Sequence, residues 1–163
     1  MAYEFYVTVE GTRMGKFKGE GPKKGEKIPG LSFQYEVIAP HDPATGQHSG
    51  KRQHKPVTFV KEWGASTPQF FGALVNNEVL KTVKFEFMQI NQNGEEFVFF
   101  TINLTNASVA GIRQYTETPE GAPSSKHAST PGNRELEAIS FTFQKIELEN
   151  KTAKTMAMDD WSQ

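Results

Sequence analysis

Histidine is the side chain in this sequence best suited to acid–base or metal chemistry, and most of the 4 histidines share one polar segment. His41, His48 and His54 lie within residues 39–56, close to Asp42. Imidazole and carboxylate bind zinc, but the spacing of these residues matches no known helical or hairpin ligand pattern. A flexible polar loop seldom preorganises metal ligands. We therefore predict a solvated loop, with no metal and no other cofactor.

Nucleophilic and carboxylate catalysis leave no clear signature in the chain. No Gly-x-Ser-x-Gly turn joins a predicted strand to a predicted helix, as a serine hydrolase elbow would. Glu4, Glu36 and Glu86 lie on predicted strands, where a carboxylate pair could hydrolyse glycosides. Each also suits the polar face of an alternating strand, which is the interpretation we favour. The run Gly15–Gly19 lacks the residue order of a P-loop. We predict no catalytic residue and a protein that is not an enzyme.

Aromatic and basic side chains allow a binding function as the alternative. Tyr6, Trp63, Tyr115 and Trp161 could form a platform for sugars or single-stranded bases. The basic run within residues 51–55 could contact phosphate, although such a run is usually a solvated face. A monomeric carbohydrate- or nucleotide-binding β-sandwich module therefore stays open beside a purely structural role.

Length and composition indicate one ordinary globular domain over residues 1–163, with 36% hydrophobic and 23% charged residues. The 13 phenylalanines favour strands, and the 9 prolines and 14 glycines separate short elements, so the composition favours a mostly β chain. The net charge of -1 gives no basic field for nucleic acid. With 0 cysteines, neither a disulfide nor a thiolate metal site is possible.

The amino terminus reads as a strand and not as a secretory signal, because no basic segment precedes an apolar one. No apolar run approaches the roughly 20 residues that a membrane helix needs. We therefore expect a protein that is made in the cytoplasm and is not inserted in a membrane. If it leaves the cell, we expect it to do so without a cleaved signal peptide.

Alternation of apolar and polar residues predicts strands at several places. They cover residues 3–9, 31–37, 57–63, 82–90, 95–104, 109–115 and 136–148, with a weak terminal strand at the tail. Asn93-Gly94 between two apolar runs predicts a hairpin turn, and the phase slip near Gln144 predicts a β-bulge. Residues 39–56 and 116–134 are predicted long loops.

One helix is predicted after residue 65. Ser66 or Thr67 can cap it, Pro68 suits its first turn, and Gln69 stands at capping-box spacing from Ser66. An apolar stripe is expected from four residues, Phe70, Phe71, Leu74 and Val75. Strands without βα alternation and a single helix predict a mostly β fold: an antiparallel β-barrel or sandwich with one flanking α-helix and long loops.

Two predicted strands are apolar on both faces. Residues 97–100 read Phe-Val-Phe-Phe, while Phe85 and Phe87 share one face and Met88 and Ile90 share the other. One face packs into the core of the domain, and the other must meet the helix or another subunit, because an exposed apolar face aggregates. The pattern therefore favours a protein that assembles with copies of itself.

The order of elements and the motifs of residues 49–90 resemble those of the Hcp family, the haemolysin-coregulated tube proteins of bacterial type VI secretion. The stretch begins with Gly50-Lys51 and His54-Lys55-Pro56, and continues with a strand that carries Lys61-Glu62-Trp63. A helix start at Ser66-Thr67-Pro68 and the long hairpin follow. The structural motif carried over from the family is Lys61, Glu62, Trp63, Ser66 and Pro68.

The resemblance implies a ring-forming subunit that closes into hexamers, which stack into a tube carrying effector proteins in its lumen. It also implies a contractile sheath and a spike protein as partners, and export through the type VI apparatus. The family's long early loop reaches the neighbouring ring, and it corresponds here to residues 40–56. The candidate stacking residues are therefore His41, Asp42, Lys51, Arg52, Gln53 and His54.

Overall fold

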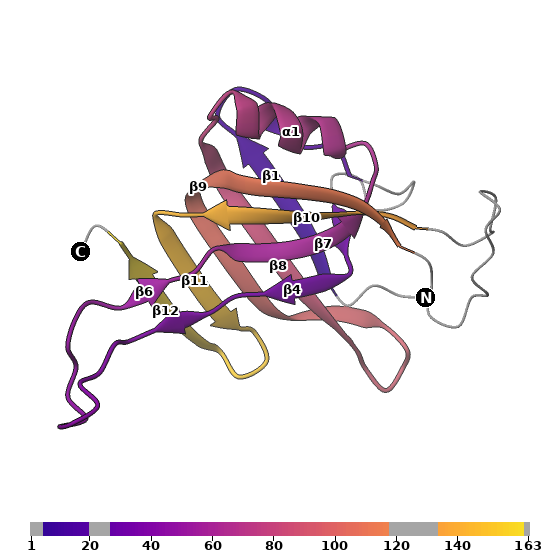
Figure 1. Ribbon diagram of the computed structural model, residues 1–163. Coiled ribbons are helices and arrows are strands. Elements are labelled where there is room, and N and C mark those ends of the chain that lie inside the picture. The colour runs from indigo at the N-terminus through magenta and orange to yellow at the C-terminus, as the bar shows by residue number, and fades with distance from the viewer. Residues whose placement is uncertain (1–4, 20–26, 118–133, 162–163) are drawn as a thin grey trace.

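The computed structural model describes residues 5–19, 27–117 and 134–161, where antiparallel strands accompany one helix, α1 (Thr67–Val75) (Figure 1). The strands of the first half are β1 (Phe5–Gly11), β2 (Gly15–Lys16), β3 (Ile28–Gly30), β4 (Ser32–Gln34), β5 (Val37–Ile38), β6 (Gln53–His54) and β7 (Val57–Glu62). Those of the second half are β8 (Leu80–Ile90), β9 (Glu96–Glu117), β10 (Arg134–Thr142), β11 (Lys145–Asn150) and β12 (Thr155–Asp160). The predicted mostly β fold with one helix is confirmed, in its sandwich-like form.

Strand β9 belongs to both layers of the sandwich. It is 22 residues long, and its first half pairs with β8 and β11 while its second half pairs with β10. We predicted separate strands over 95–104 and 109–115, and this was wrong. The chain bends at Asn106, whose φ of 51° lies in the left-handed region that asparagine tolerates, so pairing continues through the bend.

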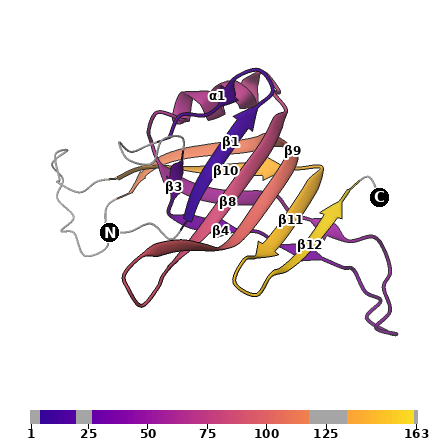
Figure 2. The same ribbon diagram turned by 180° about the vertical axis from the view of Figure 1, so that it is seen from behind.

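One layer contains β1, β8, β11, β12 and the first half of β9, and the other contains β10, β7, β4 and the second half of β9 (Figures 1 and 2). Residues 28–34 tie the layers together at their far edges. In this segment β3 pairs with β1, β4 pairs with β7, and Leu31 N–H donates to Val60 O at 2.8 Å. Glycine at position 30 lets this segment pass close to Phe5, because a Cβ there would lie 2.0 Å from the Phe5 ring.

Our predicted strand over 31–37 is interrupted. Strand β4 ends at Gln34, and β5 begins at Val37 in a separate two-stranded sheet. Alternation persists in the sequence because Tyr35 still packs against the core, but the backbone leaves the main sheet, and Val37 is 48% exposed.

Phenylalanine rings from both layers and from α1 fill the core. Phe59 lies 5.8 Å from Phe141 and 5.7 Å from Phe85, between ring centroids. Phe70 of α1 reaches the same cluster, 6.0 Å from Phe59 and 5.0 Å from Phe17. Aromatic pairs at these separations stabilise beyond the area that they bury. The helix therefore covers one end of the sandwich, at the top in Figure 1.

The helix begins where it was predicted, with Pro68 in its first turn, but the capping box does not form. The Ser66 side chain makes no capping hydrogen bond, and Gln69 Oε1 instead accepts from Lys18 N–H at 2.8 Å. The Gln69 side chain is therefore used to hold the segment after β2, a long-range contact that spacing along the chain does not reveal.

The predicted apolar stripe of the helix is narrower than expected. Phe70 and Ala73 are buried, whereas Phe71 and Val75 are 59% and 55% exposed. Residues three or four apart share a helix face, so Phe70, Ala73 and Leu74 meet the core and the positions beside them turn outward.

The predicted strand over 136–148 is interrupted near Gln144, where the apolar alternation changes phase. The interruption is not the predicted β-bulge: one strand ends and another begins in a different direction. Strand β10 ends at Thr142 and β11 begins at Lys145, with Gln144 N–H within 3.3 Å of two carbonyls of β9. The break is complete because the two strands pair with different halves of β9 and so lie in different layers. The terminal strand of the tail is confirmed as β12.

The hairpin turn at residues 91–94 is confirmed, with Gly94 at a φ of +79° and the Asn91 side chain accepting from Asn93 and Glu95 N–H. This end of the β8–β9 hairpin lies away from α1 (Figure 1). There Ile90 is 62% exposed and Phe97 is 36% exposed. The second apolar face is therefore not covered by the helix at this end. Residues 118–133 of the predicted loop over 116–134 lie outside the described residues.

Candidate functional site: the projecting arm and its clamp

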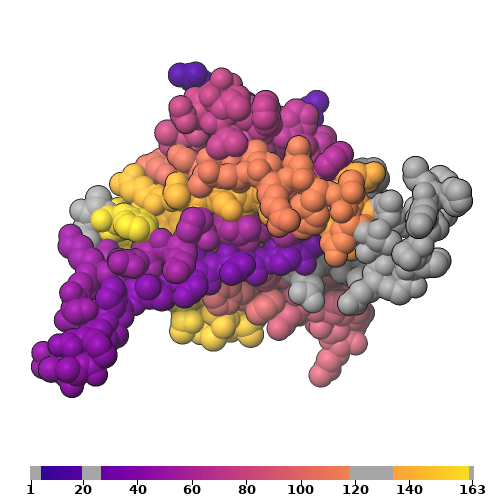
Figure 3. Space-filling model, viewed as in Figure 1, coloured from indigo at the N-terminus to yellow at the C-terminus, as the bar shows by residue number. Residues whose placement is uncertain are grey.

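The predicted loop over 39–56 is folded as a β-hairpin, which we call the arm and define as residues 37–54. Strands β5 and β6 pair at its base, and His41 pairs with His48 further out. Ser49 N–H donates to Pro40 O at 2.9 Å between these two pairs. The arm stands out from the body at lower left in Figure 1, and Figure 3 shows its tip surrounded by open space.

The tip of the arm is held by a compact turn. Asp42 N–H donates to Gln47 O, and Gly46 N–H donates to Asp42 O, both at 2.7 Å. The Asp42 carboxylate accepts from Ala44 N–H at 2.9 Å, an Asx-type bond typical of turns. Gly46 takes the left-handed conformation, with a φ of +74°. A polar sequence therefore folds by local bonding, with its side chains exposed from residue 43 to residue 51.

The base of the arm is fastened to the carboxyl-terminal strand by four side chains that we call the clamp: Tyr35, Arg52, His54 and Asp159. Arg52 Nε donates to Asp159 Oδ2 at 2.6 Å, and His54 Nε2 lies 2.6 Å from the same oxygen. Arg52 Nη2 also donates to the Asp160 carbonyl at 2.9 Å. On the other side of the imidazole, the Tyr35 hydroxyl lies 2.6 Å from Nδ1.

Electrostatics favour the charged forms of two clamp residues, Arg52 and Asp159. The hydrogen bond from Arg52, together with the hydrogen bond from His54 and the positive charge of the guanidinium, holds the pKa of Asp159 below its usual range. The bond to Asp159 raises the pKa of Arg52. Burial, followed by the charge on Asp159, raises the pKa of Tyr35. The Tyr35 hydroxyl can donate to His54 Nδ1 in the tautomer whose Nε2–H donates to Asp159.

Aromatic rings enclose the clamp histidine, whose side chain is only 4% exposed. The His54 ring lies 5.1 Å from Trp161 and 5.3 Å from Phe143, and it stacks on Tyr35 with an angle of 10° between the planes. Burial strengthens the polar contacts of such a network. The direction of the arm is therefore set by the last strand of the fold.

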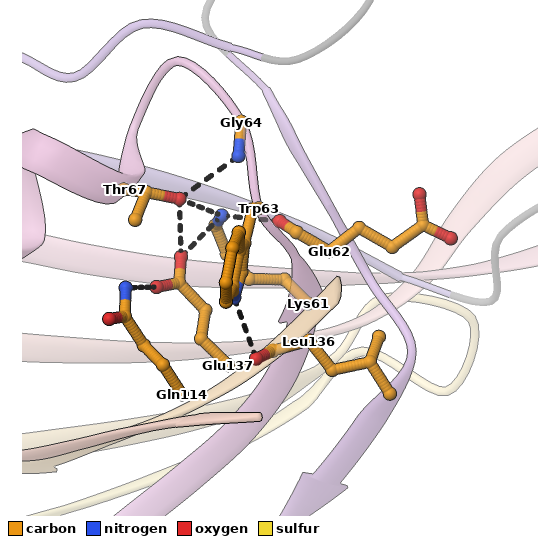
Figure 4. Close-up of polar contacts among 8 residues, drawn as sticks. All are labelled: Lys61, Glu62, Trp63, Gly64, Thr67, Gln114, Leu136 and Glu137. Atoms are coloured by element: carbon orange, nitrogen blue, oxygen red, sulfur yellow. Dashed lines mark hydrogen bonds and ion pairs between the residues drawn. The ribbon is translucent and has the colours of Figure 1, made fainter. Parts of the chain in front are cut away.

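The Lys61-Glu62-Trp63 motif takes part in a second polar network, which is built around a fully buried ion pair (Figure 4). Lys61 Nζ lies 2.7 Å from Glu137 Oε1, and both side chains are 0% exposed. Lys61 also donates to the Glu62 carbonyl at 2.7 Å, and Thr67 Oγ1 donates to Glu137 at 2.8 Å. A buried pair of charges is tolerated only when such further bonds satisfy it.

This network joins the start of the helix to the sheet. Gly64 N–H donates to Thr67 Oγ1 at 2.9 Å, and Trp63 Nε1 donates to Leu136 O at 2.7 Å. The Glu62 side chain lies outside the network on the surface, where its carboxylate is 3.4 Å from Arg134. The motif therefore supports the fold, and Pro68 lies in the first turn of the helix that the network anchors.

The six candidate stacking residues do not share one environment. His41, Asp42 and Lys51 lie on the outer part of the arm, whereas Arg52 and His54 are held in the clamp. Gln53 is the exposed residue of β6. Tyr35, Asp159 and Glu137 are missed by sequence reasoning, because their partners lie far away along the chain and no local pattern marks them.

The residues considered for other functions do not gather into one site. Tyr6 is buried at 5% exposure and Trp161 packs on His54, so the four aromatics form no shared platform. Glu86 is paired with Lys27 at 3.4 Å, and Glu4 lies outside the described residues. Across residues 5–19, 27–117 and 134–161, no group of three or more histidines or carboxylates is placed to hold a metal. Within the same ranges, no helix has the length and apolar character to cross a membrane.

Comparison with known proteins places this sandwich and its arm in the class of bacterial type VI secretion proteins. The chain belongs to the Hcp family: the family model described as "Type VI secretion system effector, Hcp" matches residues 6–149. A curated relative, "Major exported protein" of Pseudomonas aeruginosa, is 28% identical over 175 residues, covering 99% of this chain and 96% of the relative.

Solved structures agree with this assignment. A structure described as "Crystal structure of Hcp protein" superimposes with a TM-score of 0.82 at 26% identity, covering 98% of this chain and 100% of the other. An Hcp1 protein from E. coli EAEC 042 shares the fold at 22% identity, with a TM-score of 0.81 and coverage of 98% and 99%. "Secreted protein Hcp3 from Pseudomonas aeruginosa" does so at 23% identity, with a TM-score of 0.76 and the same coverage. The fold of these structures is thus consistent with membership of the Hcp family.

Proposed function

We propose that the chain is a structural subunit of the type VI inner tube, whose copies close into hexameric rings that stack and carry effector proteins in the lumen. The observation that carries this proposal is the arm. It extends the fold outward by a hairpin whose tip is exposed, and the clamp fixes the direction in which it points. An ordered segment that contributes so little to the core of its own subunit is suited to contact another one.

Stacking would place the outer part of the arm, with His41, Asp42 and Lys51, against the next ring. A head-to-tail contact of this kind uses different surfaces on the two partners, so it can repeat from ring to ring without limit. The arm is polar, and polar contacts between two rings fix how the rings align more than they strengthen binding between them. Tubes built in this way can be extended and dismantled.

Closure of the ring would use the apolar surface that the helix leaves open. Ile90 and Phe97 are exposed at the end of the β8–β9 hairpin, and Met156 and Met158 are 61% and 54% exposed on β12. In the described part of the chain β12 pairs with β11 alone, so its outer edge can receive a strand of a second copy. Exposed apolar side chains beside an open strand edge favour a subunit contact.

The same proposal includes the other partner proteins and the pathway by which the protein is exported. Membership of the Hcp family supports a contractile sheath outside the tube, a spike protein at its tip and effectors within it. We propose synthesis in the cytoplasm and export through the apparatus without a cleaved signal peptide. No catalytic residue and no cofactor are needed for this role.

Negative-stain microscopy and sedimentation of the purified protein test the proposal. We expect ring particles with a central hole, and stacked rings at high concentration. In a variant that replaces residues 41–48 by Asn-Gly, Pro40 and Ser49 are joined by a tight turn and the clamp is kept. This variant should form single rings without stacks. Persistence of stacks would make the assignment of the arm wrong, and a strictly monomeric wild-type protein would make the ring wrong.

The alternative, a monomeric binding module, is favoured by one observation. A pocket of about 360 Å³ beside the clamp is lined by His54, Lys55, Pro56, Thr142, Phe143 and Trp161. Aromatic walls with a nearby cation suit a sugar or a nucleotide. Titration with mono- and oligosaccharides and nucleotides, followed by tryptophan fluorescence in the wild type and in Trp161→Phe, decides this alternative. A saturable change that the variant loses would support the module.

A further inference from the structure

The arm brings two histidines face to face. His41 and His48 are directly opposite each other in an antiparallel bridge, with ring centroids 4.3 Å apart and ring planes tilted by 38°. Both residues are exposed. Spacing along the sequence indicated no hairpin ligand pattern, because the turn over residues 42–47 that sets this register is not evident from composition. The hairpin brings the two side chains together, which the spacing does not reveal.

The two rings lie close enough for small side-chain rotations to let them share one metal ion. Two ligands about 2.0–2.1 Å from a tetrahedral zinc ion lie about 3.3 Å from each other. Opposite residues of an antiparallel pair have Cβ atoms about 4.5–5.5 Å apart, so small side-chain rotations bring one nitrogen of each ring to that distance. Exposure of His41 and His48 leaves those rotations unhindered by packing.

We propose that His41 and His48 form a bidentate site for a divalent transition-metal ion that prefers imidazole, such as zinc. Imidazole nitrogen suits zinc, copper and nickel and does not suit magnesium or calcium. The remaining coordination positions take water. With only two protein ligands, the site binds more weakly than a closed structural site with four.

The other candidate ligands in the arm are already engaged. Both ring nitrogens of His54 lie 2.6 Å from partners, the Tyr35 hydroxyl and Asp159 Oδ2. The Asp42 carboxylate accepts from Ala44 N–H and shapes the turn. The ion is therefore held by the pair alone, at a point where the arm has few bonds between its strands. Binding cross-links these strands and stiffens the tip, and only its effect on ring stacking rests on the proposed function.

Isothermal titration with zinc chloride, using protein without an affinity tag, tests the site. We expect one ion per chain in the wild type and at least tenfold weaker binding in His41→Gln and in His48→Gln. Gln47→Ala is the matched control, an exposed neighbour without an imidazole, and it should bind as the wild type does. Equal affinity in the wild type and both glutamine variants, or no binding by the wild type, would overturn the proposal.

Hydrogen exchange of the arm provides a second measurement that does not depend on assembly. Zinc should slow exchange of the Asp42 and Gly46 amides in the wild type and leave them unchanged in His48→Gln. The titration is made on the chain whether or not rings stack, so failure of the tube proposal leaves this result unaffected. Slower exchange in both proteins would place the ion elsewhere and refute the site.

Discussion

Arg52 and Asp159 are 107 positions apart in the chain, yet the guanidinium Nε donates to the carboxylate Oδ2 at 2.6 Å. This contact joins the base of the arm to the last strand of the fold. His54 adds a second bond to the same oxygen at 2.6 Å. The arm therefore cannot change direction without breaking contacts with β12, and the carboxyl-terminal strand acts as its anchor.

Asp159→Asn tests this anchor. The amide keeps the shape of the carboxylate but loses the charge that draws Arg52, so we expect faster hydrogen exchange over residues 37–54 and an unchanged core. Rings should persist while stacks become fewer, because the arm loses its fixed direction. Glu149→Gln is the matched control, since it also removes one carboxylate from the β11–β12 hairpin. Unchanged exchange in the arm would show that the clamp does not hold it.

The pH dependence of the clamp follows from the lowered pKa of Asp159. A carboxylate whose pKa is lower when folded stabilises the native state fully above its unfolded pKa of about 3.9. This contribution is lost as the pH falls through the still lower folded value. The difference in Tm between wild type and Asp159→Asn should therefore be present at pH 5 and shrink progressively below about pH 4. A difference that grows with acidification would contradict the assignment.

The buried pair of Lys61 and Glu137 should respond differently to single and double changes. Lys61→Met leaves an uncompensated buried carboxylate and should cost about 3–5 kcal/mol of the free energy of unfolding. Lys61→Met combined with Glu137→Leu removes both charges and should recover most of that loss. Urea denaturation at one fixed protein concentration measures all three proteins. A double variant as unstable as the single one would show that the pair itself is stabilising.

Gly30 and Gly50 form a matched pair for the tie between the layers. Gly30→Ala places a methyl group within 2.0 Å of the Phe5 ring, whereas a Cβ at Gly50 has nothing within 4 Å. We expect a loss of about 1–3 kcal/mol for Gly30→Ala, as for overpacked cores, and little change for Gly50→Ala. Thermal unfolding measures both. Equal effects would mean that Phe5 can move aside.

Much of the fold was predicted because its signals are local. Alternation identified β1 and β7, Asn93-Gly94 identified the hairpin turn, and Pro68 marked the first turn of the helix. These signals act within a few residues, so each can be read in its own stretch of chain. The family motif over residues 49–90 added the secretion class, which no physical pattern in the chain specifies.

The candidate site was predicted only in part. The segment 39–56 and the residues His41, Asp42 and Lys51 were identified as candidates for stacking, and that role remains a prediction. The hairpin itself was not foreseen, because a polar segment carries no alternation from which pairing can be read. Asp159 was missed altogether, since its partners lie more than 100 positions away.

By itself, the sequence determined which segments can be strands, where the helix begins and which family the chain resembles. Those properties depend on side-chain period and backbone preference over short distances. Only the tertiary structure decided that β9 spans both layers, that Lys61 meets Glu137, that His41 faces His48 and that the arm is clamped to β12. Such contacts depend on strand order and register, which arise when distant segments share one core.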